Sequence, residues 1–67
     1  MNKFASKFKE LREEKGLSQV ELAKELGFTQ SAIAKWESGD RNPSLDLLVT
    51  IARYFKVTTD YLLGLED

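Results

Sequence analysis

A row of short polar side chains near the middle of the chain has residue types that could recognise the edges of DNA base pairs. If residues 30–38 form a helix, Ser31, Lys35 and Ser38 share one face of it, because residues three or four apart lie together. Gln30 stands in the first turn of the same helix. Glutamine can bond bidentately to an adenine edge, lysine can reach a guanine or a phosphate, and serine can bond to either base.

The exposed face of any helix is polar, so each of these residues taken singly could belong to an ordinary protein surface. The residues around the row are therefore the stronger indication. Thr29 can cap the start of the helix, Ile33 and Trp36 form its apolar face, and Gly39 can end it. Ala34 leaves room beside the polar row for another surface to approach closely. The helix therefore has one face for a core and one that is free.

A second helix precedes this one, and only a three-residue turn separates the two. Ser18 and Glu21 form a capping box at its start, in which each side chain satisfies a free backbone donor. Ala23 is small enough to let two helices cross closely, and Gly27 permits the positive φ that the turn needs. The buried face of this helix is predicted to contain Leu22, Ala23 and Leu26. The pattern predicts a helix-turn-helix over about residues 18–38.

Helical spacing also predicts the elements on either side of this motif. The first helix ends near Gly16 and has apolar positions at Phe4, Phe8 and Leu11. The fourth, capped by Ser44, has an apolar face made of Leu45, Leu48, Ile51, Ala52 and Phe55. The last, capped by Thr58 and closed by Gly64, carries Tyr61, Leu62 and Leu63. Because no segment has a strand signal, the expected fold class is all-α: one compact five-helix domain over residues 1–67.

The composition restricts the classes of function. The chain has 67 residues without cysteine or histidine, which excludes disulfides, thiolate or imidazole metal sites and the usual nucleophile–base pairs. Its carboxylates form no cleft-like cluster and it lacks a phosphate-binding glycine loop, so we expect neither an enzyme nor a cofactor. No apolar run approaches the roughly 18 residues of a membrane span, and no small-molecule ligand is evident. A soluble cytoplasmic protein is expected.

The charge is almost balanced overall but unevenly placed. The net charge of −1 and the pI near 5.4 argue against indiscriminate binding to polyanions. Lysine and arginine exceed the acidic residues over residues 1–17, whereas the acidic residues are in excess over residues 43–67. Charge alone therefore does not establish a nucleic-acid partner.

The stretch LSQVELAKELGFTQSAIAKWESG, residues 17–39, resembles the helix-turn-helix of the phage-repressor family, also called the Cro/repressor or Xre type. The resemblance extends back to LREEKGLSQ at residues 11–19 and on through RNPSLDLLVTIARYFKVTTDYLLG at residues 41–64. It implies a five-helix, sequence-specific DNA-binding transcriptional regulator, typically a repressor, whose third helix reads the major groove of double-stranded DNA.

The resemblance implies a role for individual positions. Gln19 matches a phosphate-contacting glutamine, and Arg41 and Asn42 match positions that hold the DNA backbone. Ala34 and Asp40 depart from the family, because alanine makes no side-chain hydrogen bond and the aspartate adds negative charge beside the backbone-binding loop. The base-facing positions of the family correspond to Thr29, Gln30, Ser31, Ala34 and Lys35.

Two further positions are expected to be structural. Arg12 and Glu37 match a buried ion pair that ties the first helix of the family to the third. The attraction between two such charges offsets their desolvation rather than adding much stability. Trp36 is expected in the core, with an alternative in which its indole N–H faces a phosphate.

The partner implied by the resemblance is an inverted-repeat operator bound by a homodimer. A single short helix reads only a few base pairs, and a two-fold axis would double its contacts. The expected dimer interface comprises Val57, Tyr61 and Leu65, although Tyr61 and Leu65 could instead simply close the core. A different class of function also stays open: a protein-interaction module, such as an antitoxin-like or adaptor domain, that uses the same fold.

Overall fold

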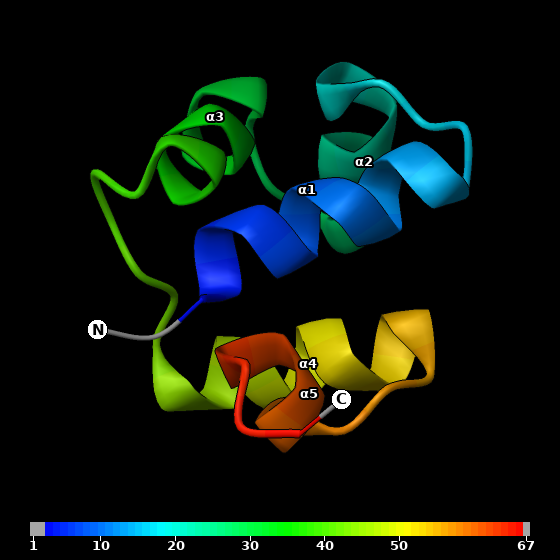
Figure 1. Ribbon diagram of the computed structural model, residues 1–67. Coiled ribbons are helices and arrows are strands. Elements are labelled where there is room, and N and C mark those ends of the chain that lie inside the picture. The colour runs from blue at the N-terminus through cyan, green and yellow to red at the C-terminus, as the bar shows by residue number, and fades with distance from the viewer. Residues whose placement is uncertain (1–2, 67) are drawn as a thin grey trace.

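Five helices make up the ordered elements in a computed structural model that describes residues 3–66 (Figure 1). The helices are α1 (Phe4–Glu14), α2 (Gln19–Leu26), α3 (Gln30–Ser38), α4 (Leu45–Phe55) and α5 (Thr59–Leu63). Within residues 3–66 there is no strand, so the predicted all-α, five-helix fold is confirmed. The predicted domain also included residues 1–2 and 67, which lie outside the described residues.

Four of the five helices begin at the capping residues that the sequence indicates. The Ser18 hydroxyl accepts a hydrogen bond from the Glu21 amide, and the Glu21 carboxylate accepts one from the Ser18 amide, which completes the capping box. The bond from the Ser18 amide is the main reason that the pKa of Glu21 is lowered. Thr29, Ser44 and Thr58 cap α3, α4 and α5. The hydroxyl oxygen of each accepts a hydrogen bond from the backbone amide three residues further on.

One helix ends without the glycine that its backbone favours. Gly27 ends α2 in the left-handed region, with φ 77°, as the turn to α3 requires. Lys56 ends α4 in the same region, with φ 60° and ψ 43°, and is the one non-glycine residue of the described chain with positive φ. A side chain in this conformation costs free energy because its Cβ approaches the following carbonyl oxygen.

The core forms around α1, which crosses the middle of the molecule between the α2–α3 pair and the α4–α5 pair (Figure 1). Phe8 is fully buried, and its ring contacts Trp36 of α3 and Phe55 of α4 edge to face and stacks on Phe4. Every helix contributes to the buried cluster, which contains Phe4, Phe8, Leu11, Leu22, Ala23, Ile33, Trp36, Leu48, Ile51, Ala52 and Leu62. One core thus fixes the position of α3.

The prediction for the apolar face of α4 is wrong at Leu45, which is 82% exposed. Leu45 is the first residue of α4, and helical side chains lean toward the N-terminus, so its side chain projects past the packed part of the helix. Leu26 and Phe55, also predicted as core residues, are only partly buried and pack against the edge of the cluster. No helix within residues 3–66 is long and apolar enough to cross a membrane.

Candidate nucleic-acid interface

The two faces of α3 differ as sharply as the sequence pattern indicates. Ile33 and Trp36 are buried beneath the helix, at 0% and 4% exposure. On the outside, the predicted base-facing residues Thr29, Gln30, Ser31 and Lys35 are all exposed, whereas Ala34 is half-buried. Four of the five positions therefore lie on an accessible surface, and Ala34 lies at its edge.

The turn between α2 and α3 is held by a backbone hydrogen bond and by a contact between two aromatic rings. The Phe28 amide donates to the Ala23 carbonyl over 2.8 Å, and the Phe28 ring meets the Trp36 ring edge to face at 5.4 Å between centroids. Ala23 is 3% exposed, consistent with the close helix crossing predicted from its size. The outer row of α3 is thus carried on a fixed frame, which specific recognition requires.

Arg12 and Glu37, the expected ion pair, are joined by two hydrogen bonds. The Arg12 Nε donates to Glu37 Oε2 over 2.6 Å, and its Nη2 donates to Oε1 over 3.2 Å. The two side chains are only 11% and 5% exposed, and the Arg12 Nη1 also donates to the Leu17 carbonyl over 2.6 Å. The hydrogen bond to Glu37 is the main reason that the pKa of Arg12 is raised. The pair connects α1, the α1–α2 turn and α3.

A chain of hydrogen bonds, which was not predicted from the sequence, leads from this ion pair to the surface. The Gln19 Nε2 donates to Glu37 Oε1 over 3.1 Å, and the Gln30 Nε2 donates to Gln19 Oε1 over 2.6 Å. Gln19, which is predicted to contact phosphate, is therefore hydrogen-bonded to Gln30, which is predicted to contact bases. The one signal in the sequence is that Gln30 and Glu37 are seven residues apart and share a face of α3.

The loop between α3 and α4 carries the expected backbone contacts, Arg41 and Asn42, and both are exposed. The Arg41 amide donates to the Lys35 carbonyl over 3.3 Å, which holds the loop against the end of α3. The Ser38 hydroxyl also donates to the Lys35 carbonyl and accepts from the Asp40 amide. Ser38 therefore stabilises the end of α3. Its hydroxyl is less available to a ligand than its place in the predicted polar row suggests.

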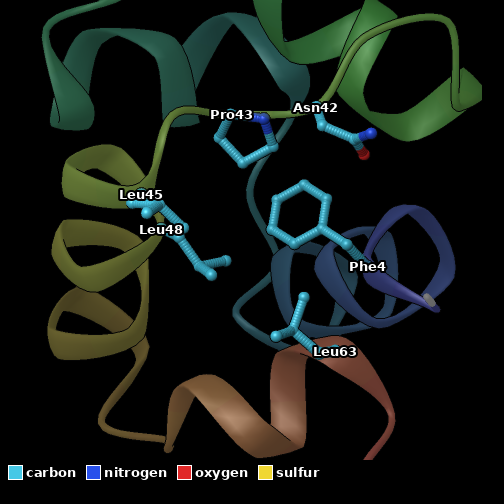
Figure 2. A pocket seen from close by; sticks show the side chains of 6 residues that line it. All are labelled: Phe4, Asn42, Pro43, Leu45, Leu48 and Leu63. Atoms are coloured by element: carbon cyan, nitrogen blue, oxygen red, sulfur yellow. The ribbon is translucent and has the colours of Figure 1, made fainter.

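Beneath this loop is a small hollow of about 170 Å³. In Figure 2 the Phe4 ring points between Pro43 and Leu48, and Leu63 lies below the ring. The hollow is lined by Phe4, Asn42, Pro43, Leu45, Leu48 and Leu63. Ligand pockets typically measure about 300–1,000 Å³ and hold several polar groups, so we assign this hollow to loose packing beside the exposed Leu45.

The residues expected at a dimer interface differ in exposure. Val57 and Tyr61 are half-buried and pack against the core, and the Lys7 Nζ lies 4.8 Å from the centre of the Tyr61 ring. Leu65 is 72% exposed, while its amide donates to the Asp60 carbonyl over 2.8 Å. Of the three, Leu65 offers the largest exposed apolar side chain.

Comparison with known proteins gives the class to which this fold and surface belong. A family model described as Helix-turn-helix matches residues 8–62. The chain belongs to this family, which confirms the predicted Xre-type, phage-repressor resemblance.

Individual relatives are regulators of transcription. The HTH-type transcriptional activator BcrR of Enterococcus faecalis is 42% identical over 64 residues, which are 96% of this chain and 31% of BcrR. A solved transcriptional regulator from Listeria innocua superposes with a TM-score of 0.89 at 28% identity, over 100% of this chain and 63% of that one. The P22 c2 repressor protein, solved in complex with a synthetic operator, has the same fold, with a TM-score of 0.84 at 24% identity over 94% and 96% of the two chains.

Two features of these relatives bear on function. This chain spans 31% of BcrR and about half of the next relatives by similarity, so the relatives contain further regions. One relative is an activator by name and one structural neighbour is a repressor by name, so the shared domain does not distinguish activation from repression.

Proposed function

We propose that this chain binds double-stranded DNA in a sequence-specific manner and acts in the regulation of transcription, with α3 in the major groove. The observation that carries the proposal is the exposed row of Gln30, Ser31 and Lys35 on a helix whose opposite face is buried. A major groove about 12 Å wide admits an α-helix, and these side chains can donate to and accept from base edges. The family membership supports binding to DNA, and the P22 c2 repressor, which has the same fold, was solved in complex with a synthetic operator.

Phosphate contacts are proposed on both sides of α3. Arg41 and Asn42 extend from the loop that follows it, and Gln19 stands at the first turn of α2, where free backbone N–H groups favour anions. Thr29 is the N-cap of α3, and its hydroxyl oxygen already accepts from the Ala32 amide. Its methyl group is therefore the part that we propose to meet a base, most simply a thymine methyl.

We propose further that two copies bind an inverted repeat. Half-sites read by such motifs lie one helical turn apart, about 34 Å. The longest dimension of the domain is 28 Å, measured over Cα atoms, so two copies at that spacing would meet only at their edges. The exposed Leu65, with the half-buried Val57 and Tyr61, is the proposed edge.

A selection of bound duplexes from a random pool, followed by titration of the selected site at several salt concentrations, tests the proposal. We expect an enriched sequence with inverted symmetry, two chains per site in sedimentation, and affinity that falls steeply with salt because phosphate contacts release counterions. One chain per site on an asymmetric sequence would reject the dimer alone. No complex with any duplex would reject DNA binding and favour a protein-interaction module, which the net charge of −1 would also permit.

A further inference from the structure

Charged side chains of both signs surround the proposed edge of the dimer. On one side of it, α1 packs along α5 and contributes two lysines. The Lys7 Nζ lies 4.8 Å from the centre of the Tyr61 ring, and the aliphatic part of Lys3 lies over Gly64, where an added Cβ would come within 2.9 Å of it. The Lys3 amide also donates to the Leu63 carbonyl over 3.2 Å. These contacts hold the basic side of the edge, Lys3 and Lys7, against α5.

The opposite side of the same edge is acidic. Asp60 precedes Tyr61 and is turned from it by about 100° around α5. Asp60 is exposed, whereas Leu62, turned the other way, is fully buried. The chain then folds back along α5, because the Leu65 amide donates to the Asp60 carbonyl over 2.8 Å and Glu66 Oε1 accepts from the N-cap hydroxyl of α5 over 2.7 Å. Asp60 and Glu66 form the acidic side, and Tyr61 lies between it and the lysines.

The charges of the two sides are not paired with each other. Within residues 3–66 the only ion pair joins Arg12 to Glu37, so the two lysines and the two carboxylates of the edge keep their charges free. The carboxylates would repel a polyanion such as DNA, which makes the edge unsuited to phosphate contacts. A partner that presents the opposite arrangement of charges fits it better.

A two-fold axis gives a second copy of this chain that opposite arrangement. When the axis runs along the boundary between the two sides, the rotation places the basic side of each copy against the acidic side of the other. An axis at right angles to the boundary would place like charges together. The charges therefore permit one of these two orientations, and every favourable contact in it occurs twice.

We propose that the basic side of each copy pairs with the acidic side of the other, with Lys7 opposite Asp60, and that these reciprocal pairs select the orientation in which two copies meet. The inference rests on the proposed binding of two copies to an inverted repeat. The apolar contact at Leu65 is small, because domains 28 Å long meet only at their edges at the half-site spacing. Ion pairs at such an edge give orientation more than affinity, so the copies should associate weakly without DNA.

The test reverses the charges one at a time and together. In each variant, the affinity of the second chain for the selected inverted repeat is divided by the affinity of one chain for a duplex with a single half-site. The contacts with DNA cancel in this ratio, and the contribution of the contact between copies is left. The variants are Lys7→Glu, Asp60→Lys and the two combined. Lys9→Glu is the matched control, because Lys9 is exposed and lies on the other side of α1 from Lys7.

We expect the ratio to fall about fivefold or more in Lys7→Glu and in Asp60→Lys, because each reversal replaces attraction by repulsion at two symmetric places. The double variant should return to within about twofold of the parent protein, since the two signs are exchanged and the pair is restored. Lys9→Glu should keep the parent's ratio. One chain should bind the single half-site with the same affinity in Lys7→Glu and in Lys9→Glu.

An unchanged ratio in Asp60→Lys overturns the inference, and this variant decides the matter if Lys7→Glu fails to fold, because Asp60 is exposed. Losses in both single variants without recovery in the double variant would also overturn it, since the two residues would then act separately. A parent ratio that shows a contact between copies but is indifferent to every reversal rejects the charge pairing alone. If the second chain gains nothing over a single half-site, the proposed dimer fails as well, and the edge is left to a different protein partner.

Discussion

The two halves of the molecule expose different chemistry although they share one core. In α1–α3, hydrogen bonds connect the Leu17 carbonyl to Gln30 at the surface, by way of Arg12, Glu37 and Gln19. In α4 and the segment after α5, the most exposed large apolar side chains of the described residues are found, Leu45 at 82% and Leu65 at 72%.

This difference separates two kinds of recognition. Hydrogen-bonded side chains have fixed directions and can distinguish the donors and acceptors of base pairs. Apolar contacts have no direction and are suited to burying area against another protein surface. We therefore assign base readout to the half with the polar chain and propose contact with a second copy for the other half.

The largest expected effect is on the stability of the protein when the ion pair between α1 and α3 is broken. Arg12→Ala leaves the Glu37 carboxylate, 5% exposed, without its charged partner. We expect the free energy of unfolding, measured with urea, to fall by about 3–5 kcal/mol, as for other buried pairs that lose one member. Arg53→Ala on α4 is the control, since Arg53 is exposed and should change stability by no more than about 0.5 kcal/mol. Equal losses in the two variants would mean that the ion pair is not the structural link between α1 and α3.

The next largest effect is expected on the affinity for DNA, with the stability of the fold unchanged. Gln30→Ala and Lys35→Ala should each weaken binding to the selected duplex by about 1–3 kcal/mol at fixed salt, because each removes a proposed base contact. Their thermal unfolding should stay close to that of the parent protein, since both side chains are exposed. Lys9→Ala on the exposed face of α1 controls for the loss of a positive charge. If both α3 variants bind like this control, α3 is not the reading helix.

A smaller and less specific effect is expected from the loop. Arg41→Ala should lower affinity for all duplexes together and reduce the slope of log affinity against log salt by about 1, because a phosphate contact releases counterions but reads no base. Titrations of the selected and a scrambled duplex at several salt concentrations provide the measurement. A change in the preferred base at one position would place Arg41 in a groove rather than on the backbone.

The smallest expected effect is a gain in the stability of the protein from a substitution at the end of α4. Lys56 has φ 60°, where glycine is favoured, so Lys56→Gly should raise the free energy of unfolding by about 0.5 kcal/mol after the greater chain entropy of glycine is counted. Gly39→Ala is the matched opposite, because Gly39 has φ 83° and open space around an added Cβ. It should destabilise the protein. A loss of stability in Lys56→Gly would show that contacts of the lysine side chain outweigh its backbone strain.

Local features of the fold were predicted well because their causes are local. Ser18, Thr29, Ser44 and Thr58 all cap helices where the sequence places them, since a capping bond joins residues three apart. The buried positions of α3 follow from helical spacing in the same way. Leu45 shows the limit of spacing, because a residue at the end of an apolar face is buried only if another element reaches it.

The five helices, their caps and the outward row on α3 could be predicted, because they depend on residues within one or two turns of each other. The hydrogen bonds from Gln30 to Gln19 and from Gln19 to Glu37 could not, because they join residues 11 and 18 apart in the sequence. The same holds for the contact of Lys7 of α1 with the Tyr61 ring. Such contacts depend on the distance and angle at which helices cross, and these are set by how the side chains of all five helices fill one core.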